Sequence, residues 1–312
     1  MLTAAKSTSS RILVVRLGAM GDIIHALPAV ASLKTGFPGS RLTWIVEPKW
    51  APLLEDNPFI DRLVLLRRGT LAGLLESWRS LRAERYDFAV DFQGLIKSAL
   101  AAYAARPGRI FGFHRSQLRE RAAALFYSHK TVSRAAHVVD KNLDLATAAG
   151  AATLLRTFPL PAGRPEGALP PGDFVLASPL AGWRAKQWPI EHYQALAARL
   201  ERELGIPLVL DGPPGSGLDH CSSLSGLIHA TRRAAAVVGV DSGPLHLAAA
   251  LGKPGVAIYG PTDPARNGPY GDSLRVLRSP AAVTTYKRGA SIDEAMRAVS
   301  PAQVFEALKA ML

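Results

Sequence analysis

Several short loops of this chain carry residues that could move a proton. The segment Gly18-Ala19-Met20-Gly21-Asp22 follows a β-branched run, and its two glycines let the backbone turn tightly before Asp22. Aspartate is a favoured helix N-cap, so Asp22 is equally well interpreted as a cap or as a functional carboxylate. The loop contains one G-x-x-G and lacks the G-x-G-x-x-G of dinucleotide sites, so an NAD site is poorly supported.

Two later loops could hold phosphate. In the first, Ala181 and Gly182 precede Lys186, whose ammonium together with backbone N–H groups would suit a diphosphate. The alternative for Lys186 is an ordinary surface lysine. The second loop could bind phosphate through the N-terminus of a following helix, capped by Asp241 or Ser242.

That second loop reads Asp241-Ser242-Gly243-Pro244-Leu245-His246, with the proline in the first helical turn. A helix N-terminus exposes unpaired N–H groups and partial positive charge, which attract anions. His246 stays near this terminus, although a lone helix histidine is usually structural.

Other chemistries are excluded by missing patterns. HExxH, paired CxxC, Walker A and G-x-S-x-G do not occur, which argues against zinc proteases, zinc ribbons, P-loop NTPases and α/β-hydrolases. A further turn contains Asp263, which is as suited to stabilising the turn as to touching a ligand.

The elements that must position these loops alternate between strands and helices, as in parallel βαβ units. In the first half, strands are predicted at 12–15, 42–46, 63–66, 88–91 and 109–113. Helices are predicted at 23–35, 71–85 and 95–105, with Pro28 kinking the first.

A Pro/Gly-rich segment between Thr157 and Asp173 separates two similar halves. Beyond it, strands are predicted at 174–177, 208–210, 237–240 and 256–259, and helices at 190–204, 224–235 and 244–251. Ser300 and Gln303 form a capping-box pattern that starts a closing helix over 301–311. We expect an N-terminal domain 1–160, a linker 161–172, a C-terminal domain 173–300 and a closing helix 301–312. Both domains would be α/β and doubly wound, facing a central cleft.

The charge balance indicates an anionic partner. The 312 residues are 48% hydrophobic and carry a net charge of +12, which suits nucleic acid, a membrane surface or a phosphorylated substrate. Residues 1–160 hold 22 basic and 12 acidic residues (+10), and residues 161–312 hold 15 and 13 (+2). The single cysteine, Cys221, and the absence of signal-peptide and membrane-spanning patterns predict a cytoplasmic protein.

Five segments, in order, resemble the type I enzymes of the ADP-heptose:lipopolysaccharide heptosyltransferases, glycosyltransferase family 9. They are MGDIIHALPA at 20–29, DFQGLIKSAL at 91–100, KQWP at 186–189, VDSGPLHLAAALGKP at 240–254 and YGPTDP at 259–264. The resemblance implies a GT-B fold with two Rossmann-like domains, the N-terminal one binding acceptor and the C-terminal one binding donor. It implies inverting transfer of heptose from ADP-L-glycero-β-D-manno-heptose to the Kdo of lipid A, without metal or cofactor.

The resemblance also implies residue roles. Asp22 would be the catalytic base, and Lys186, Asp241, Ser242, Gly243 and His246 would contact the donor, with Ala181 and Gly182 contributing only backbone N–H groups where relatives have threonines. The loop 211–217 is shorter than in relatives, whose acidic residue there holds the nucleotide ribose; Asp219 is a candidate replacement.

The acceptor would meet the basic N-terminal half. Arginine suits phosphates and carboxylates because its planar fork matches both. The candidates are Arg67, Arg68, Arg79, Lys97, Arg115, Arg119, and His137 with Lys141 at helical spacing; for any single residue a solvated basic face is the alternative. A peripheral contact with the inner membrane follows from the acceptor. The alternatives are another GT-B enzyme of the lipopolysaccharide core and a non-enzymatic nucleic-acid-binding protein; low aromatic content and absent binding motifs argue against the latter.

Overall fold

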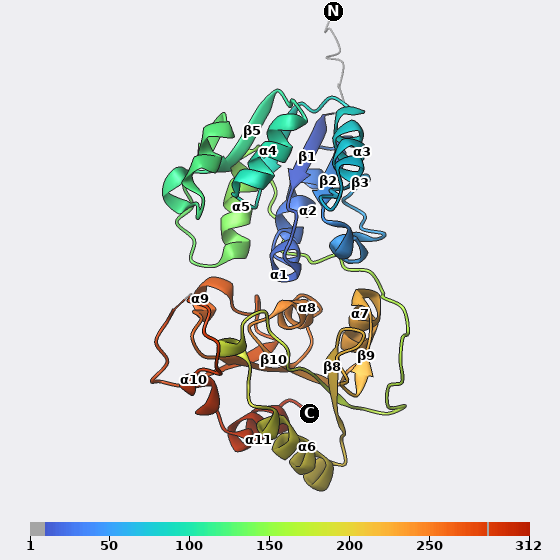
Figure 1. The fold of residues 1–312 in the computed structure, drawn as a ribbon, viewed down its shortest axis with the longest axis vertical. Coiled ribbons are helices and arrows are strands. Elements are labelled where there is room, and N and C mark those ends of the chain that lie inside the picture. Colours follow the sequence, from blue (N-terminus) through green and yellow to red (C-terminus); the bar gives the residue numbers. More distant parts are fainter. Residues whose placement is uncertain (1–9, 286) are drawn as a thin grey trace, which may run out of the picture. The chain divides into compact units, whose positions relative to one another are not determined.

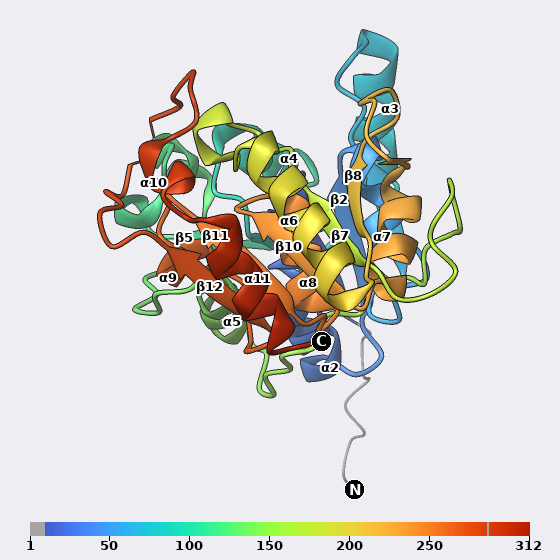
Figure 2. The ribbon, with the colours of Figure 1, turned by 90° about the horizontal axis from the view of Figure 1, so that it is seen from below.

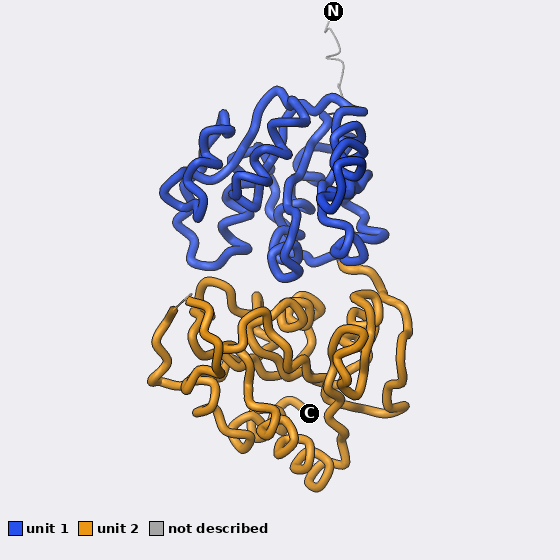
Figure 3. The backbone as a smooth tube through the Cα atoms, in the orientation of Figure 1, with its two compact units in different colours: residues 1–159 blue, residues 160–312 orange. Residues whose placement is uncertain are grey.

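The chain folds into two compact units, residues 1–159 and residues 160–312, as a computed structural model shows (Figure 3). The structure describes residues 10–285 and 287–312. Residues 1–9, over which the sequence shows no signal-peptide pattern, lie outside the described residues. Each unit is an α/β structure with one parallel sheet (Figure 1).

The first unit contains a six-stranded parallel sheet in the order β3-β2-β1-β4-β5-β6. Strand β1 lies at its centre because it pairs with both β2 and β4. The strands are β1 Arg11–Val15, β2 Arg41–Val46, β3 Arg62–Leu65, β4 Phe88–Asp91, β5 Arg109–Phe113 and β6 His129–Thr131. The five predicted strands are confirmed within one residue. The prediction missed β6 because its sequence, His-Lys-Thr, has no apolar pattern and lies at the sheet edge.

The helices of the first unit cover both faces of this sheet. They are α1 Met20–Ile24, α2 Leu27–Gly36, α3 Leu71–Arg82, α4 Ile96–Ala104 and α5 Val138–Ala148, with 3-10 turns η1 Pro48–Leu54, η2 Arg115–Gln117 and η3 Arg121–Phe126. Helices α2 and α5 pack together, whereas α3, α4 and η3 share a separate core cluster with the sheet. The predicted single helix over 23–35 is wrong. The chain forms two helices, and Pro28 stands in the first turn of α2, where its missing N–H costs no hydrogen bond.

The second unit repeats the plan with the strand order β12-β11-β10-β7-β8-β9. Its strands are β7 Val175–Ser178, β8 Leu208–Gly212, β9 His220–Cys221, β10 Ala236–Val240, β11 Gly255–Tyr259 and β12 Leu274–Arg278. The four predicted strands are confirmed. The prediction missed β9, which has two residues, and β12, an edge strand in which arginines alternate with apolar residues.

The four predicted helices of the second unit are confirmed, whereas the short helices α9 and α10 were not predicted. They are α6 Ile190–Leu204, α7 Leu224–Arg233, α8 Gly243–Ala250, α9 Pro264–Asn267, α10 Glu294–Arg297 and α11 Pro301–Lys309, with the 3-10 turn η4 Arg184–Lys186. Helices α6 and α11 lie side by side (Figure 2). The capping box of α11 is present, since Ser300 and Gln303 exchange hydrogen bonds.

All strands within a unit are parallel, so the loops that follow their carboxyl ends gather at one edge of each sheet. These two edges therefore carry the motifs identified from the sequence. Among the described residues, no helix has the length and apolar character needed to cross a membrane.

Candidate functional site

The carboxylate of Asp22 is anchored on one side and open to solvent on the other. Asp22 is the third residue of α1, and Ala19 is the N-cap, so the interpretation of Asp22 as the N-cap is wrong. Its Oδ2 lies 2.7 Å from Arg16 Nη2 and accepts a hydrogen bond from the Ala19 N–H at 3.3 Å. The side chain is 37% exposed. An anchored carboxylate with solvent access can accept a proton from an incoming hydroxyl.

The tight approach of two loops explains one glycine before Asp22. A Cβ on Gly18 would lie 2.6 Å from Nε1 of Trp50, which belongs to η1. Any larger residue would displace either this loop or the indole. The glycine therefore lets the loop after β1 pack against the loop after β2.

Buried Arg16 connects the loop after β1 to the loop after β4. Its Nη1 donates a hydrogen bond to the Phe92 carbonyl at 2.5 Å, while its Nη2 faces Asp22. The next residue is held in the same way, because the Leu17 N–H donates to Gln93 Oε1 at 2.7 Å. Two neighbouring strand ends thus determine where Asp22 stands.

Asp91, the last residue of β4, holds the loop that follows this strand through hydrogen bonds. This fully buried carboxylate accepts hydrogen bonds from the N–H groups of Gln93 and Gly94 and from the hydroxyls of Ser98 and Tyr127. Burial raises the pKa of Asp91, and four donors oppose that effect. Burial and the adjacent Asp91 raise the pKa of the Tyr127 phenol, which keeps Tyr127 a donor. Asp91 therefore supports the Asp22 loop without being open to a substrate.

Two of the predicted acceptor residues are brought together by a carboxylate that the sequence reasoning missed. Glu47 follows β2, and its Oε1 pairs with Arg68 and lies 3.6 Å from Lys97 Nζ. Arg67 lies beside Arg68 with an exposed side chain, and its backbone N–H donates to Ser77 Oγ. Arg67 and Arg68 follow β3 and Lys97 follows β4, so these cations stand at the same sheet edge as Asp22, which follows β1.

The loop after β5 forms a second basic site. Arg115 lines a pocket of about 340 Å³ together with Arg121 and Lys130, which the sequence reasoning did not single out. Arg119 is exposed nearby in sequence but does not line this pocket. The sequence signal for Arg121 and Lys130 was weak because neither lies in a recognisable motif.

His137 lies against the motif that contains Asp22. Its ring centroid is 5.5 Å from that of buried His25, with an edge-on arrangement. His137 is also the N-cap of α5, because its Nδ1 accepts a hydrogen bond from the Val139 N–H at 3.1 Å. Lys141 follows in the first turn of α5, so both predicted residues lie at the start of one helix.

In the second unit, three of the predicted donor residues form one ionic cluster. Lys186, at the end of η4, places Nζ 3.0 Å from Oδ2 of Asp241, which follows β10. His246 Nε2 lies 3.5 Å from Asp241 Oδ1. Burial by itself raises the pKa of Asp241, but the His246 hydrogen bond and the Lys186 ammonium lower the pKa well below its ordinary value. Asp241 is therefore an anion that orients two cationic or donor groups.

The N-terminus of α8 is prepared for an anion. Ser242 is its N-cap residue, yet the Ser242 hydroxyl makes no cap bond. The Oγ atoms of Ser242 and of Thr262, which follows the neighbouring strand β11, are buried without a hydrogen-bond partner among the described residues. Unsatisfied buried hydroxyls are costly, so a ligand oxygen bound there would be stabilised. Gly243 is the first residue of α8, and because it has no side chain it leaves the N-terminus of the helix accessible.

The predicted turn before Lys186 is open. Gly182 is exposed, and a Cβ on Gly182 would meet nothing within 4 Å. Ala181 is half-buried against the core of the second unit. The Lys186 ammonium stands over the Trp183 ring at 5.0 Å from its centroid. The turn thus presents backbone and an aromatic face beside the ammonium.

A pocket of about 210 Å³ lies next to this cluster and contains Asp211, not the predicted Asp219. Asp219 is occupied, because its Oδ2 accepts a hydrogen bond from the Leu210 N–H at 3.1 Å. Ser178, Leu180, Ser222, Leu227 and Pro244 also line the pocket.

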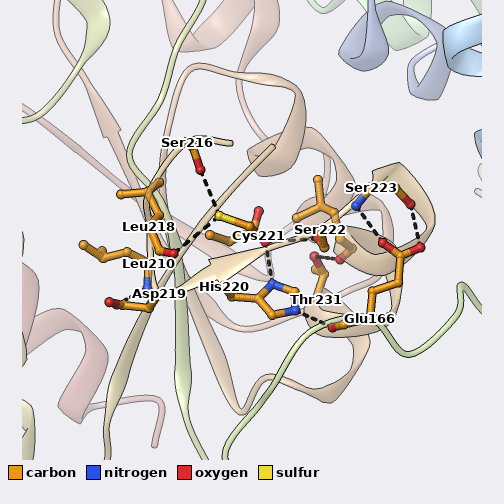
Figure 4. A network of polar contacts seen from close by, with 12 residues as sticks. Glu166, Leu210, Ser216, Leu218, Asp219, His220, Cys221, Ser222, Ser223 and Thr231 are labelled. Carbon is orange, nitrogen blue, oxygen red and sulfur yellow. Dashed lines mark hydrogen bonds and ion pairs between the residues drawn. The ribbon is translucent and has the colours of Figure 1, made fainter. Parts of the chain in front are cut away.

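Asp211 is held by a buried histidine. His220 Nδ1 lies 2.7 Å from Asp211 Oδ1. On the other side of the ring, His220 Nε2 lies 2.7 Å from the Glu166 carbonyl, a contact drawn in Figure 4. A carbonyl only accepts, so Nε2 carries a proton. Ser222 Oγ also donates to Asp211 at 3.3 Å. The network fixes one pocket wall and ties the segment that contains Glu166 to the sheet of the second unit.

The turn residue Asp263 has a local role. Its Oδ1 accepts a hydrogen bond from the Ala265 N–H at 2.9 Å, so Asp263 is the N-cap of α9. Across the described part of the chain, no group of three or more His, Cys, Asp or Glu side chains could hold a metal ion.

Known proteins resemble this chain in sequence and in fold. The family model described as glycosyltransferase family 9 (heptosyltransferase) matches residues 74–217 and 221–294, more than half of the chain. The chain belongs to glycosyltransferase family 9. It is 29% identical over 309 residues to lipopolysaccharide heptosyltransferase 1 of Escherichia coli strain K12, covering 86% of this chain and 94% of that one.

Solved structures of this family agree. The structure of Escherichia coli heptosyltransferase WaaC with ADP is 26% identical, with a TM-score of 0.79 over 97% of this chain and 100% of that chain. The same enzyme with ADP-2-deoxy-2-fluoro heptose is 25% identical, with a TM-score of 0.76 over 96% and 99%. The predicted GT-B class is therefore confirmed, and membership of an enzyme family displaces the nucleic-acid-binding alternative.

Proposed function

We propose that this family 9 enzyme transfers heptose from ADP-L-glycero-β-D-manno-heptose to the Kdo of the lipid A inner core in lipopolysaccharide biosynthesis. The observation that carries the proposal is the cluster of Lys186, Asp241 and His246 beside the open N-terminus of α8, where an ammonium and unpaired helix N–H groups together suit a diphosphate. The heptosyltransferases that resemble this chain support the nature of the sugar.

The donor diphosphate would bind at α8. Lys186 Nζ and the Ser242 hydroxyl would contact its oxygens, together with the N–H groups at the start of the helix. The exposed turn at Ala181 and Gly182 would add backbone donors. The pocket beside it would take the nucleoside, with Asp211 and its neighbouring serine facing the ribose hydroxyls in place of Asp219.

Asp22 would act as the general base. The acceptor hydroxyl gives its proton to the Asp22 carboxylate while its oxygen attacks the anomeric carbon, and the bond from that carbon to the diphosphate breaks on the opposite side. One displacement of this kind inverts the anomeric configuration. Arg16 keeps the carboxylate oriented, and the solvent-exposed side of Asp22 leaves room for the acceptor.

Charge that develops on departing ADP would be stabilised without a metal. Lys186 and the α8 N-terminus act on the leaving phosphate most strongly when it carries the extra charge, so they lower the barrier more than they stabilise the bound donor. The Asp241 carboxylate would hold the Lys186 ammonium in position. It would also partly neutralise the charge of that ammonium until the leaving phosphate becomes more negative and attracts Lys186 more strongly.

The acceptor would be held by the basic edge of the first unit. Arg67, Arg68 and Lys97 would meet phosphates or Kdo carboxylates on one side and Arg115, Arg119 and His137 on the other. Because this acceptor is a lipid, we also propose that the enzyme works as a peripheral protein on the cytoplasmic face of the inner membrane.

The direct test is incubation with ADP-heptose and detergent-dispersed Kdo-lipid A, with ADP release and product mass as readouts. We expect one heptose per acceptor, an anomer opposite to that of the donor, and an unchanged rate after EDTA treatment. Incubation with UDP-glucose is the donor control. Transfer to an acceptor that already carries heptose, but not to Kdo-lipid A, would instead assign a later step of core assembly.

A further inference from the structure

Helix α3 exposes an apolar stripe that its own unit does not cover. The stripe follows helical spacing of three and four residues, so its members share one side of the helix. The opposite part of the helix is buried against the sheet. The stripe consists of Leu71 (81% exposed), Leu74 (41%), Leu75 (52%) and Trp78 (44%).

Helix α4 exposes a second stripe on the same face of the sheet. Ile96, Leu100 and Tyr103 are 39%, 47% and 61% exposed and recur at the same spacing. Their neighbours Ala99 and Ala102 belong to the core cluster that also contains Leu81 of α3. The two stripes are therefore parts of one surface, which we call the α3–α4 face.

The stripes converge on a cationic aromatic pocket. Trp78 and Tyr103 both line a cavity of about 650 Å³, together with Phe126 and the arginines 82, 106 and 109. The Arg82 guanidinium stands 4.6 Å from the Trp78 ring centroid. The pocket is formed where α3 and α4 end and β5 begins, so it lies at the opposite edge of the sheet from Asp22.

The charge around these stripes is mainly positive. Residues 67–82 contain four arginines and one glutamate, and residues 96–109 contain one lysine, two arginines and no acidic residue. Exposed apolar side chains flanked by arginine, with tryptophan and tyrosine at the border, match the composition of surfaces that lie at a lipid interface. Anionic lipid head groups complement this excess of positive charge.

We propose that the α3–α4 face is a membrane-binding surface that inserts its leucines into the interface of a bilayer containing anionic phospholipid. The leucine side chains reach the acyl boundary, and the arginine side chains extend to the head groups. The cationic aromatic pocket takes a head-group phosphate, which accepts hydrogen bonds from Arg82 and Arg106.

This inference deepens the proposed function and rests on it only for the lipid nature of the acceptor. Leu71 and Ile96, which begin the two stripes, lie close in sequence to Arg67, Arg68 and Lys97 at the edge that carries Asp22. A bilayer against the α3–α4 face would therefore present its lipid head groups along that edge.

The test is flotation of the full-length protein with two kinds of vesicle. One contains phosphatidylglycerol with phosphatidylethanolamine, and the other contains phosphatidylcholine alone. We expect binding to the first and at least about tenfold weaker binding to the second. Leu75→Gln with Leu100→Gln, and separately Arg82→Gln with Arg106→Gln, should each weaken binding to the anionic vesicles by roughly tenfold or more.

Matched controls alter exposed residues of the second unit. Ile190 (42% exposed) and Val283 (78%) are changed to Gln for the leucine pair, and Arg202 and Arg275 to Gln for the arginine pair. Controls should bind vesicles as the unmodified protein does. Thermal unfolding and transfer to a water-soluble Kdo acceptor should be unchanged in every variant.

Equal vesicle binding by the α3–α4 variants and the unmodified protein would overturn the inference, as would an unmodified protein that does not float. Failure of heptose transfer alone would overturn the proposed function and leave the vesicle result standing. The two proposals are thus separable in one set of proteins.

Discussion

The Arg16 guanidinium lies 2.7 Å from the Asp22 carboxylate, and its other terminal nitrogen donates a hydrogen bond to the carbonyl of Phe92, which lies 76 positions further along the chain. This bridge explains how two adjacent strand ends orient one carboxylate. Arg16 is 7% exposed, so the ion pair is screened from solvent on its arginine side. Variants of Asp22 and of Arg16 can therefore test two things separately: the proton acceptor itself and the group that orients it.

Replacing Asp22 by Asn should remove the proton acceptor while keeping side-chain size. We expect kcat to fall by at least about 10²-fold, the scale of a lost general base, with ADP affinity unchanged. Steady-state kinetics and ADP titration calorimetry measure the two effects. Asp263→Asn, which alters only the cap of α9, is the control; turnover close to normal in Asp22→Asn would remove Asp22 from the role of base.

Replacing Arg16 by Met should lower kcat through misplacement of Asp22. We expect roughly a tenfold loss in kcat with little change in donor KM, because Arg16 belongs to the first unit and the donor residues to the second. Arg16→Lys should recover part of the activity because it keeps a cation beside the carboxylate. If Met and Lys variants lose stability and activity in parallel, Arg16 has only a structural role.

Replacing Lys186 by Ala should weaken ADP binding. A charge-assisted hydrogen bond contributes about 1.5–3 kcal/mol, which corresponds to a loss in affinity of roughly 10- to 150-fold. Isothermal calorimetry with ADP gives the number directly. Lys309→Ala, at the end of α11, serves as the matched control, and equal ADP affinity in the two variants would contradict the phosphate role of Lys186.

The ion pairs of Asp241 should make stability depend on pH in a defined direction. The folded pKa of Asp241 is below its ordinary value of 3.8, so the carboxylate stabilises the fold above that pH. This contribution is lost as the pH falls through the lower folded pKa. Asp241→Asn should therefore lower the melting temperature near neutral pH, and the difference from the unmodified protein should narrow below about pH 4.

The control for that experiment is Asp272→Asn, an exposed loop residue. Its melting curve should follow that of the unmodified protein at every pH. A constant difference between Asp241→Asn and the unmodified protein across the acid range would mean that the Asp241 carboxylate is not preferentially ionised in the folded state.

Reversing the charge of Arg67 and Arg68 should affect the acceptor more than the donor. The first unit carries a net +10 of the total +12, and these two arginines follow β3, at the sheet edge that carries Asp22. Arg67→Glu with Arg68→Glu should raise acceptor KM by roughly tenfold or more, with donor KM changed less than twofold. Arg202→Glu with Arg275→Glu supplies the matched reversal on the second unit, and equal effects on both KM values would contradict acceptor capture.

Much of the fold was predictable from the chain. Parallel strands buried on both faces have continuous apolar sequences, and β1, β4 and β10 were located from such runs. The edge strands β6, β9 and β12 were not predicted, because short or half-exposed strands have little apolar pattern. The break between α1 and α2 was not predicted, because a proline such as Pro28 is compatible both with the first turn of a new helix and with a kink inside one helix.

The candidate site was likewise predictable only in part. Asp22, Lys186 and Ser242 lie in local motifs, so the sequence by itself was enough to single them out as candidate site residues. Their partners required the tertiary structure: Lys186 meets Asp241 across 55 positions, and Asp211 rather than Asp219 lines the pocket of about 210 Å³. The physical reason is strand order. A side chain after one strand contacts a side chain after another only when the sheet places those strands side by side, and hydrogen bonding between distant segments decides that order.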